Sequence, residues 1–252
     1  MSAPIKAVTF DLWDTIIDDD SDEPKRLAQG LRPKPEERRH LLWEALNRHQ
    51  EIALEDVNAA YAAADAAFKK AWMGHSITWK VADRLARVLM ELDRTLPDAE
   101  LAKLADEMGR MEVDLPPDLI DGIANALEDL SRCYKLCVVS DTIVTPADGL
   151  RKLLDGHGIK KYFQGFSFSD EAGHSKPHTD MFLSAARQLG VDVEEMIHIG
   201  DRDHNDIKGA QALGMKAVRF TAPRDDDRDT TTADAICECF ADLPGAIEGL
   251  GG

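Results

Sequence analysis

The feature that most constrains this chain is an alternation, after residue 114, between short apolar segments and longer helical ones. Residues 134–139, 166–168, 196–199 and 216–220 are typical of buried strands, and helical patterns lie between them. Residues 5–10 have the same apolar character near the N-terminus. Strands separated by helices imply βαβ units, which build a parallel sheet covered by helices on both faces. The predicted fold class is therefore α/β.

A long helical region interrupts this alternation after the first strand. Residues 24–112 carry apolar stripes at helical spacing, with no β-like segment among them. We therefore predict an α/β core formed by residues 1–17 and 114–252, and a helical domain formed by residues 18–113. Four further helices complete the core. The first is opened by Pro116 and Pro117 and runs to about Leu130, and the second follows Pro146. The third runs from Pro177 to near Gly190, the fourth covers 205–213, and a last strand over 235–239 precedes a short helix.

The acidity of the chain excludes several classes of partner. Its 252 residues include 30 Lys and Arg against 47 Asp and Glu, a net charge of −17, and 44% are hydrophobic. That composition can fill a core, but it disfavours nucleic acid and anionic membranes as partners. No apolar run approaches the roughly 20 residues of a membrane span, and residues 1–6 do not resemble a signal peptide. We expect a cytoplasmic protein that acts on a small molecule.

Polar residues follow the predicted strands where each strand ends. Asp11, Ser140 and Asp201 come directly after apolar segments, Asp206 follows five residues later, and Lys176 precedes a helix start. Ligands of open α/β sheets bind beyond the carboxyl ends of the strands. Carboxylates gathered there repel one another, and a single lysine does not neutralise them. A hard divalent cation, most plausibly Mg²⁺, resolves this repulsion and attracts a phosphorylated substrate.

Four segments in this order resemble the motifs of the haloacid dehalogenase (HAD) superfamily. They are residues 10–15 (FDLWDT), 140–142 (SDT), 176–182 (KPHTDMF) and 199–206 (IGDRDHND). The helical region after the first motif resembles the cap that one branch of this superfamily inserts there. The resemblance implies a Rossmann-like parallel sheet core with an inserted α-helical cap domain, and a hydrolase as the activity.

The resemblance also assigns catalytic roles to the matching positions. It implies that Asp11 is the nucleophile, which forms an aspartyl-phosphate in a phosphatase. Ser140 would hydrogen-bond the transferred group, with Asp141 beside it as a further substrate-binding residue. Lys176 would neutralise the nucleophile and bind the substrate anion.

A metal site is implied by the same motifs. Mg²⁺ would be held by the carboxylates of Asp11, Asp201 and Asp206 and by the backbone carbonyl of Trp13.

One position departs from the phosphatase pattern. Phosphatases of this superfamily usually carry a second aspartate, the general acid and base, two residues after the nucleophile; here that residue is Trp13. An aromatic residue resembles the metal-independent 2-haloacid dehalogenases instead. Their fourth motif lacks the two carboxylates found at Asp201 and Asp206, so we favour a Mg²⁺-dependent phosphatase. A 2-haloacid dehalogenase and a binding protein with little turnover stay open as alternatives.

Several other residues have two interpretations. Four could replace the missing acid, although none is favoured in that role: Asp14, His174, His178 and His204. For Asp14 the favoured role is to cap or order the loop. Three arginines could reach substrate, although a helix-surface role is favoured: Arg32, Arg38 and Arg39. Three tryptophans could line a cap pocket, although packing is favoured: Trp43, Trp72 and Trp79. Cap helices could also support an oligomer. The sequence does not identify the substrate.

Overall fold

The computed structural model describes residues 4–226 and 228–251. Met1, Ser2 and Ala3, on which part of the signal-peptide prediction depends, lie outside the described residues. The chain forms two compact units. The first comprises residues 1–19, 117–141 and 154–252, and the second comprises residues 20–116 and 142–153.

A six-stranded sheet in the order β3-β2-β1-β4-β5-β6 forms the centre of the first unit. Every neighbouring pair of strands is parallel, which confirms the predicted α/β class. The strands are β1 (Ala7–Phe10), β2 (Lys135–Ser140), β3 (Gly165–Phe168), β4 (Met196–Gly200), β5 (Lys216–Phe220) and β6 (Ala235–Cys237).

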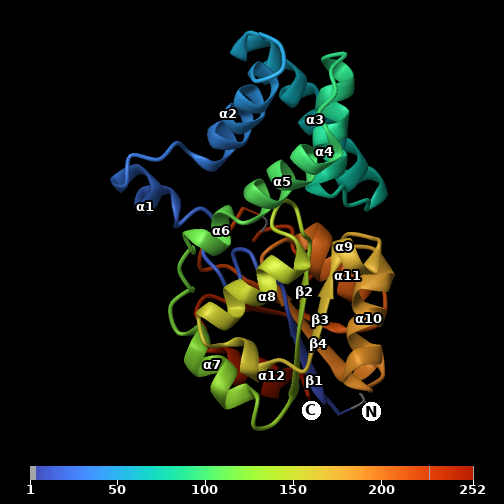
Figure 1. The fold of residues 1–252 in the computed structure, drawn as a ribbon. Coiled ribbons are helices and arrows are strands. Elements are labelled where there is room, and N and C mark those ends of the chain that lie inside the picture. The colour runs from blue at the N-terminus through green and yellow to red at the C-terminus, as the bar shows by residue number, and fades with distance from the viewer. Residues whose placement is uncertain (1–3, 227, 252) are drawn as a thin grey trace. The chain divides into compact units, whose positions relative to one another are not determined.

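Helices cover both faces of this sheet, and this is why its central strands are mostly apolar (Figure 1). On one face α10 (Thr179–Leu189) and α11 (Lys208–Gln211) pack against a cluster that includes Ala7, Cys137 and Ala217. On the other face Phe220 stacks on Phe240 with ring centroids 4.3 Å apart. Phe240 leads into α12 (Leu243–Leu250), which contacts α7 (Ile123–Leu130).

The register of the sheet brings the predicted site residues to one edge. Phe10 lies opposite Val138 of β2 and Ile199 of β4. β1 ends at Phe10, β4 one residue further at Gly200 and β2 two residues further at Ser140, so the residues at these strand ends lie along the same carboxyl edge of the sheet.

The connections differ from the prediction in three places. Residues 117–122 are not helical, because Leu119 pairs with Ile17 in an isolated antiparallel bridge and Gly122 has a φ of +85°, so α7 begins only at Ile123. The helix after Pro177 begins at Thr179, with His178 as its N-cap. The helix predicted over 205–213 begins with a π-helical turn, η3 (Asp203–Ile207), before α11. The remaining short elements are α9 (Ser169–Ala172), η1 (Lys160–Tyr162) and η2 (Val193–Glu195).

The described residues of the second unit form helices and loops, without a strand. Its core joins Leu42, Val57, Leu85 and Leu104, among others, from five helices. The three tryptophans contribute to packing: Trp43 donates to the carbonyl of Ile52, and Trp72 and Trp79 contact the ring of Phe68. Its helices are α1 (Glu23–Ala28), α2 (Lys34–Asn47), α3 (Leu54–His75), α4 (Val81–Glu91), α5 (Asp98–Gly109) and α6 (Met111–Asp114).

Residues 142–153 belong to this second unit, whereas the sequence analysis placed them in the α/β core. Arg84 of α4 donates to the carbonyl of Ile143, and Thr145 donates to the carboxylate of Glu112. The segment includes the first turns of α8 (Ala147–Gly156). These contacts are distant in sequence, so helical periodicity did not indicate them.

Among the described residues, no helix combines the length and the apolarity that crossing a membrane requires.

Candidate active site

A buried lysine joins two buried aspartates at the carboxyl edge of the sheet. Asp11 follows β1, and its backbone N–H donates to the carbonyl of Ile199, which fixes the start of the loop. The ammonium of Lys176 lies 2.6 Å from Asp11 Oδ1 and 2.6 Å from Asp206 Oδ1. The N–H of Leu12 also donates to Asp11 Oδ1, at 2.7 Å, so two donors hold this carboxylate in one orientation.

The charges of these groups shift one another's protonation. Burial alone would lower the pKa of Lys176, but the negative charges of Asp11 and Asp206 raise it above its usual value. Burial raises the pKa of Asp11, and the charge of Lys176 only partly offsets this. Burial also opposes ionisation of Asp206, but Lys176 and the hydrogen bond from His198 hold its pKa below the usual range.

Asp206 is positioned by contacts from three sides. His198 of β4 approaches its Oδ1 at 3.2 Å, and the N–H of Arg202 donates to its Oδ2 at 3.0 Å. Burial lowers the pKa of His198. A neutral ring that donates from Nε2 to Asp206 can accept at Nδ1 from the hydroxyl of Thr9, which lies 2.8 Å away.

The carboxylate of Asp206 lies directly against the end of β4. A Cβ atom built on Gly200 would lie 2.3 Å from Asp206 Cγ. Only glycine leaves room for the carboxylate here, so Gly200 is part of the machinery that positions Asp206.

Asp201 is a buried carboxylate that accepts no hydrogen bond from the described residues. It is fully buried, and neither of its side-chain oxygens has a hydrogen-bond partner among the described residues. The guanidinium groups of Arg202 and Arg224 both stand 3.6 Å from Oδ2, too far for a hydrogen bond. Burial, together with the charges of Asp206 and Asp11, raises the pKa of Asp201 to about 8.

These three carboxylates fit a hard divalent cation. Asp11, Asp201 and Asp206 each offer an oxygen, and the three oxygens lie within 4.8 Å of one another. Ligands of an octahedral Mg²⁺ ion with bonds of about 2.05 Å are separated by about 2.9 Å, or about 4.1 Å when opposite. The unpartnered oxygens of Asp201 are of the type that such an ion prefers. Trp13 lies in the loop directly after Asp11, and its carbonyl as a further ligand stays a prediction.

The residues after β2 serve two different purposes. Ser140 is fully buried, and its hydroxyl has no hydrogen-bond partner among the described residues, so it is available to a ligand. Asp141 accepts from the backbone N–H of Lys176 at 2.8 Å. The structure thus shows Asp141 holding the loop that carries Lys176, and its role in substrate binding stays a prediction.

The proposed substitutes for the missing acid lie in different places. Asp14 has a φ of +53° and accepts from the N–H of Asp19 at 3.3 Å, so it orders the loop; burial raises its pKa. His174 and His178 gather around Asp180. His204 is exposed on η3.

The arginines of the helical unit differ in burial. Arg32 precedes α2 and lies near Glu37 on the surface. Arg38 is not a surface arginine as predicted: its side chain is only 17% exposed and stands 3.9 Å from Glu112. Arg39 stands 3.7 Å from Asp65.

Sequence reasoning missed four contributors to the site: Thr9, His198, Arg202 and Arg224. Thr9 and His198 are polar residues inside otherwise apolar strands, and they occupy paired positions in the parallel register of β1 and β4. That pairing was the available signal. Arg224 reaches Asp201 from a loop beyond β5, which nothing in the local sequence indicates.

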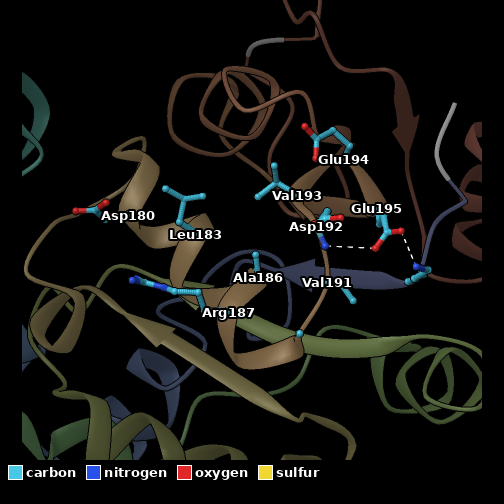
Figure 2. A pocket seen from close by; sticks show the side chains of 11 residues that line it. Asp180, Leu183, Ala186, Arg187, Val191, Asp192, Val193, Glu194 and Glu195 are labelled. Carbon is cyan, nitrogen blue, oxygen red and sulfur yellow. Dashed lines mark hydrogen bonds and ion pairs between the residues drawn. The ribbon is translucent and has the colours of Figure 1, made fainter.

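A surface hollow of about 680 Å³ lies along α10 and η2, and Asp180, Arg187 and Glu195 are among the residues that line it (Figure 2). None of the carboxylates around Lys176 is among its lining residues.

An α/β sheet with an aspartate, a lysine and two further carboxylates at its carboxyl edge is the arrangement of HAD-type hydrolases. The family model of haloacid dehalogenase-like hydrolases matches residues 5–214. The chain therefore belongs to this family and is an enzyme of the hydrolase class.

Individual relatives agree with this family. A glyceraldehyde 3-phosphate phosphatase of Methanopyrus kandleri is 37% identical over 87 residues, which are 34% of this chain and 37% of that protein. The match thus spans little more than a third of the relative's length.

Two solved structures share the fold. A HAD hydrolase of Bacillus subtilis, bound to magnesium, has a TM-score of 0.63 at 19% identity, over 97% of this chain and 99% of the other. A 2-haloacid dehalogenase of Pseudomonas syringae has a TM-score of 0.67 at 23% identity, over 98% of this chain and 99% of the other. At these identities the likeness concerns the fold alone, and it does not distinguish phosphatase from dehalogenase.

Proposed function

We propose that this protein is a Mg²⁺-dependent phosphatase that acts on a small phosphorylated metabolite through an aspartyl-phosphate at Asp11. The observation that carries the proposal is Asp201, a fully buried carboxylate beside Asp11 and Asp206 whose two oxygens accept no hydrogen bond from the described residues. Three acidic groups gather here around one buried lysine, with the guanidinium groups of Arg202 and Arg224 3.6 Å from Asp201, and a divalent cation would favour the ionised form of all three. A metal-independent dehalogenase has no use for this arrangement.

The names of similar proteins also support a Mg²⁺-dependent phosphatase. The Methanopyrus kandleri protein is named a phosphatase of a small phosphorylated aldehyde, and the Bacillus subtilis neighbour was solved with magnesium.

The residues divide the chemistry as follows. The Asp11 carboxylate attacks phosphorus, the bond from phosphorus to the ester oxygen breaks, and the leaving oxygen takes a proton from solvent water. Lys176 stays between Asp11 and Asp206 and stabilises the negative charge of the phosphoryl oxygens, to one of which Ser140 donates. Water then releases phosphate and regenerates Asp11. A Mg²⁺ ion held by Asp11, Asp201, Asp206 and the Trp13 carbonyl would offset further charge on the phosphoryl group.

Trp13 should restrict which phosphate esters the enzyme hydrolyses quickly. An indole cannot protonate the leaving oxygen or activate water, so esters of acidic alcohols should react faster than alkyl phosphates.

The proposal extends to the rest of the chain. We infer that the helical region 18–113 serves as the cap that shapes substrate choice, and that the enzyme works in the cytoplasm without nucleic acid or membrane partners. The net charge of −17 supports this absence of polyanionic partners.

The deciding experiment compares three readouts on the wild-type protein. Release of phosphate from nitrophenyl phosphate that requires Mg²⁺, is abolished by EDTA and is absent in Asp11→Asn would support the proposal. Release of halide from 2-chloropropionate without metal would identify a dehalogenase, the alternative that Trp13 favours. Binding of phosphate without turnover of either substrate would identify a binding protein.

A further inference from the structure

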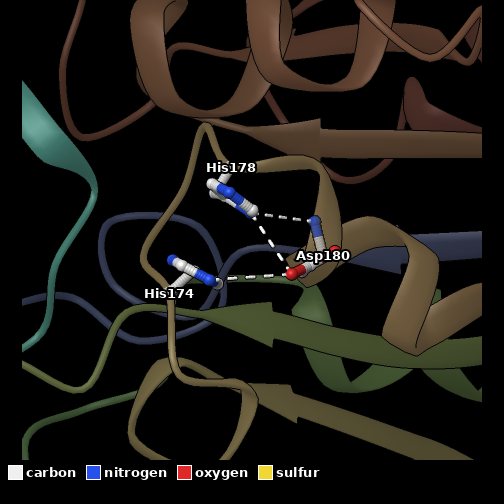
Figure 3. A group of neighbouring side chains, drawn as sticks. All are labelled: His174, His178 and Asp180. Carbon is white, nitrogen blue, oxygen red and sulfur yellow. Dashed lines mark hydrogen bonds and ion pairs between the residues drawn. The ribbon is translucent and has the colours of Figure 1, made fainter.

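A second group of side chains that could ligate a metal lies on the loop that carries Lys176 and on the first turn of α10 (Figure 3). His174 Nε2 stands 3.7 Å from Asp180 Oδ2, and His178 Nδ1 stands 3.6 Å from the same oxygen. One ligand atom from each residue lies within 4.8 Å of the others. The two imidazole rings stack with centroids 3.7 Å apart, and both direct an edge toward the carboxylate.

The spacing and the ligand types suit a transition metal. Ligands at about 2.0–2.1 Å from a tetrahedral Zn²⁺ ion are separated by about 3.3–3.4 Å, close to the two distances measured here. Imidazole nitrogen with one carboxylate favours ions of the Zn²⁺ class over Mg²⁺, which prefers oxygen. This site therefore differs in chemistry from the group around Asp201.

The hydrogen bonds of the two rings differ. The N–H of Asp180 donates to His178 Nδ1 over a long 3.3 Å, so this lone pair faces the backbone, and a metal bound at Nδ1 would replace that N-cap bond. His174 Nδ1 is buried without a hydrogen-bond partner among the described residues, so no bond through that nitrogen holds its ring in place.

Binding requires the rings to turn. Lone pairs in nearly parallel planes do not meet at one ion, so each ring must rotate about its Cβ–Cγ bond. The side chains of His174 and His178 are 40% and 37% exposed, so this rotation does not disturb the core.

An ion at this site would act on the catalytic lysine. Lys176 lies two residues from each histidine, and its backbone N–H and its ammonium are bonded to Asp141, Asp11 and Asp206. We propose that His174, His178 and Asp180 form a second metal site, for an ion of the Zn²⁺ class, and that occupancy changes turnover by displacing the loop around Lys176. The effect on turnover rests on the proposed function, whereas binding does not.

The binding test uses Co²⁺, whose visible absorption reports tetrahedral coordination. The titration is made in an Asp201→Asn background, which disables the carboxylate site. We expect one Co²⁺ per chain, displaced by Zn²⁺, with affinity at least tenfold weaker in His174→Ala and in His178→Asn, where Asn preserves the N-cap. The control His75→Ala removes an exposed histidine of α3 and should bind normally. No binding at 100 μM Co²⁺, a thiolate charge-transfer band, or equal affinity in every variant would overturn the site.

The coupling test uses the chain with Asp201 intact in excess Mg²⁺. Addition of Zn²⁺ should change kcat at least twofold, and His174→Ala should be insensitive to Zn²⁺ when its rates with and without the ion are compared. Equal sensitivity of the two proteins would refute the coupling. If no phosphate ester is turned over at all, the proposed function fails while the Co²⁺ titration still decides the metal site.

Discussion

Replacing Asp201 by asparagine should stabilise the metal-free protein and abolish its response to Mg²⁺. In the folded chain the pKa of Asp201 is raised to about 8, from 3.8 for the free side chain. At pH 7 the folded state therefore holds a proton that the unfolded state has lost. The cost is at most 7 − 3.8 = 3.2 units, or about 4 kcal/mol at about 1.36 kcal/mol per unit. Asparagine is neutral at every pH and avoids this cost.

The sign of the pH dependence follows from the same shift. Between about pH 4 and 8 the folded state binds more protons at Asp201 than the unfolded state does, so the free energy of unfolding attributable to this group falls as pH rises. In EDTA the wild type should therefore lose stability relative to Asp201→Asn across this window. Excess Mg²⁺ should narrow this gap at pH 7, because an ion at 100 times its Kd adds about 2.7 kcal/mol to the wild type alone.

The assay is urea denaturation at pH 5, 6, 7 and 8, in EDTA and in MgCl₂. Asp203→Asn is the matched control, because Asp203 lies in the same segment but pairs with Lys208 and Thr231 outside the three-carboxylate group. It should lose stability and keep the Mg²⁺ response. An Asp201→Asn protein that is less stable than wild type in EDTA and still gains stability from Mg²⁺ would refute the reasoning.

Three further changes test neighbouring parts of the site. Asp11→Asn should reduce turnover at least 10³-fold in a protein shown by thermal melt to fold, because it removes the proposed nucleophile; activity near wild type would remove Asp11 from the mechanism. Gly200→Ala should weaken Mg²⁺ binding measured by calorimetry at least tenfold, because the new Cβ would lie 2.3 Å from Asp206 Cγ; normal binding would show that Asp206 can move freely. Trp13→Asp should raise alkyl-phosphate turnover relative to nitrophenyl phosphate by roughly 10²-fold in a protein shown by thermal melt to fold; an unchanged ratio would mean that another group already serves as the acid.

Local sequence patterns predicted the parallel sheet, the edge that carries the candidate site and the family. Short apolar segments between helices predict a parallel sheet, because strands covered on both faces bury every side chain. Because parallel strands end at a common edge, Asp11, Ser140 and Asp201 could be assigned to one place. The order of the four motifs indicated the family, which the match over residues 5–214 confirms.

Contacts distant in sequence were decided only by the tertiary structure. The Thr9–His198 pair depends on which strands are neighbours, and the attachment of residues 142–153 to the helical unit depends on contacts with Arg84 and Glu112. Protonation is the clearest case. The sequence supplies Asp201 as a carboxylate, but burial beside two other acids raises its pKa to about 8. Desolvation and charge repulsion depend on distances in space, which spacing along the chain does not encode.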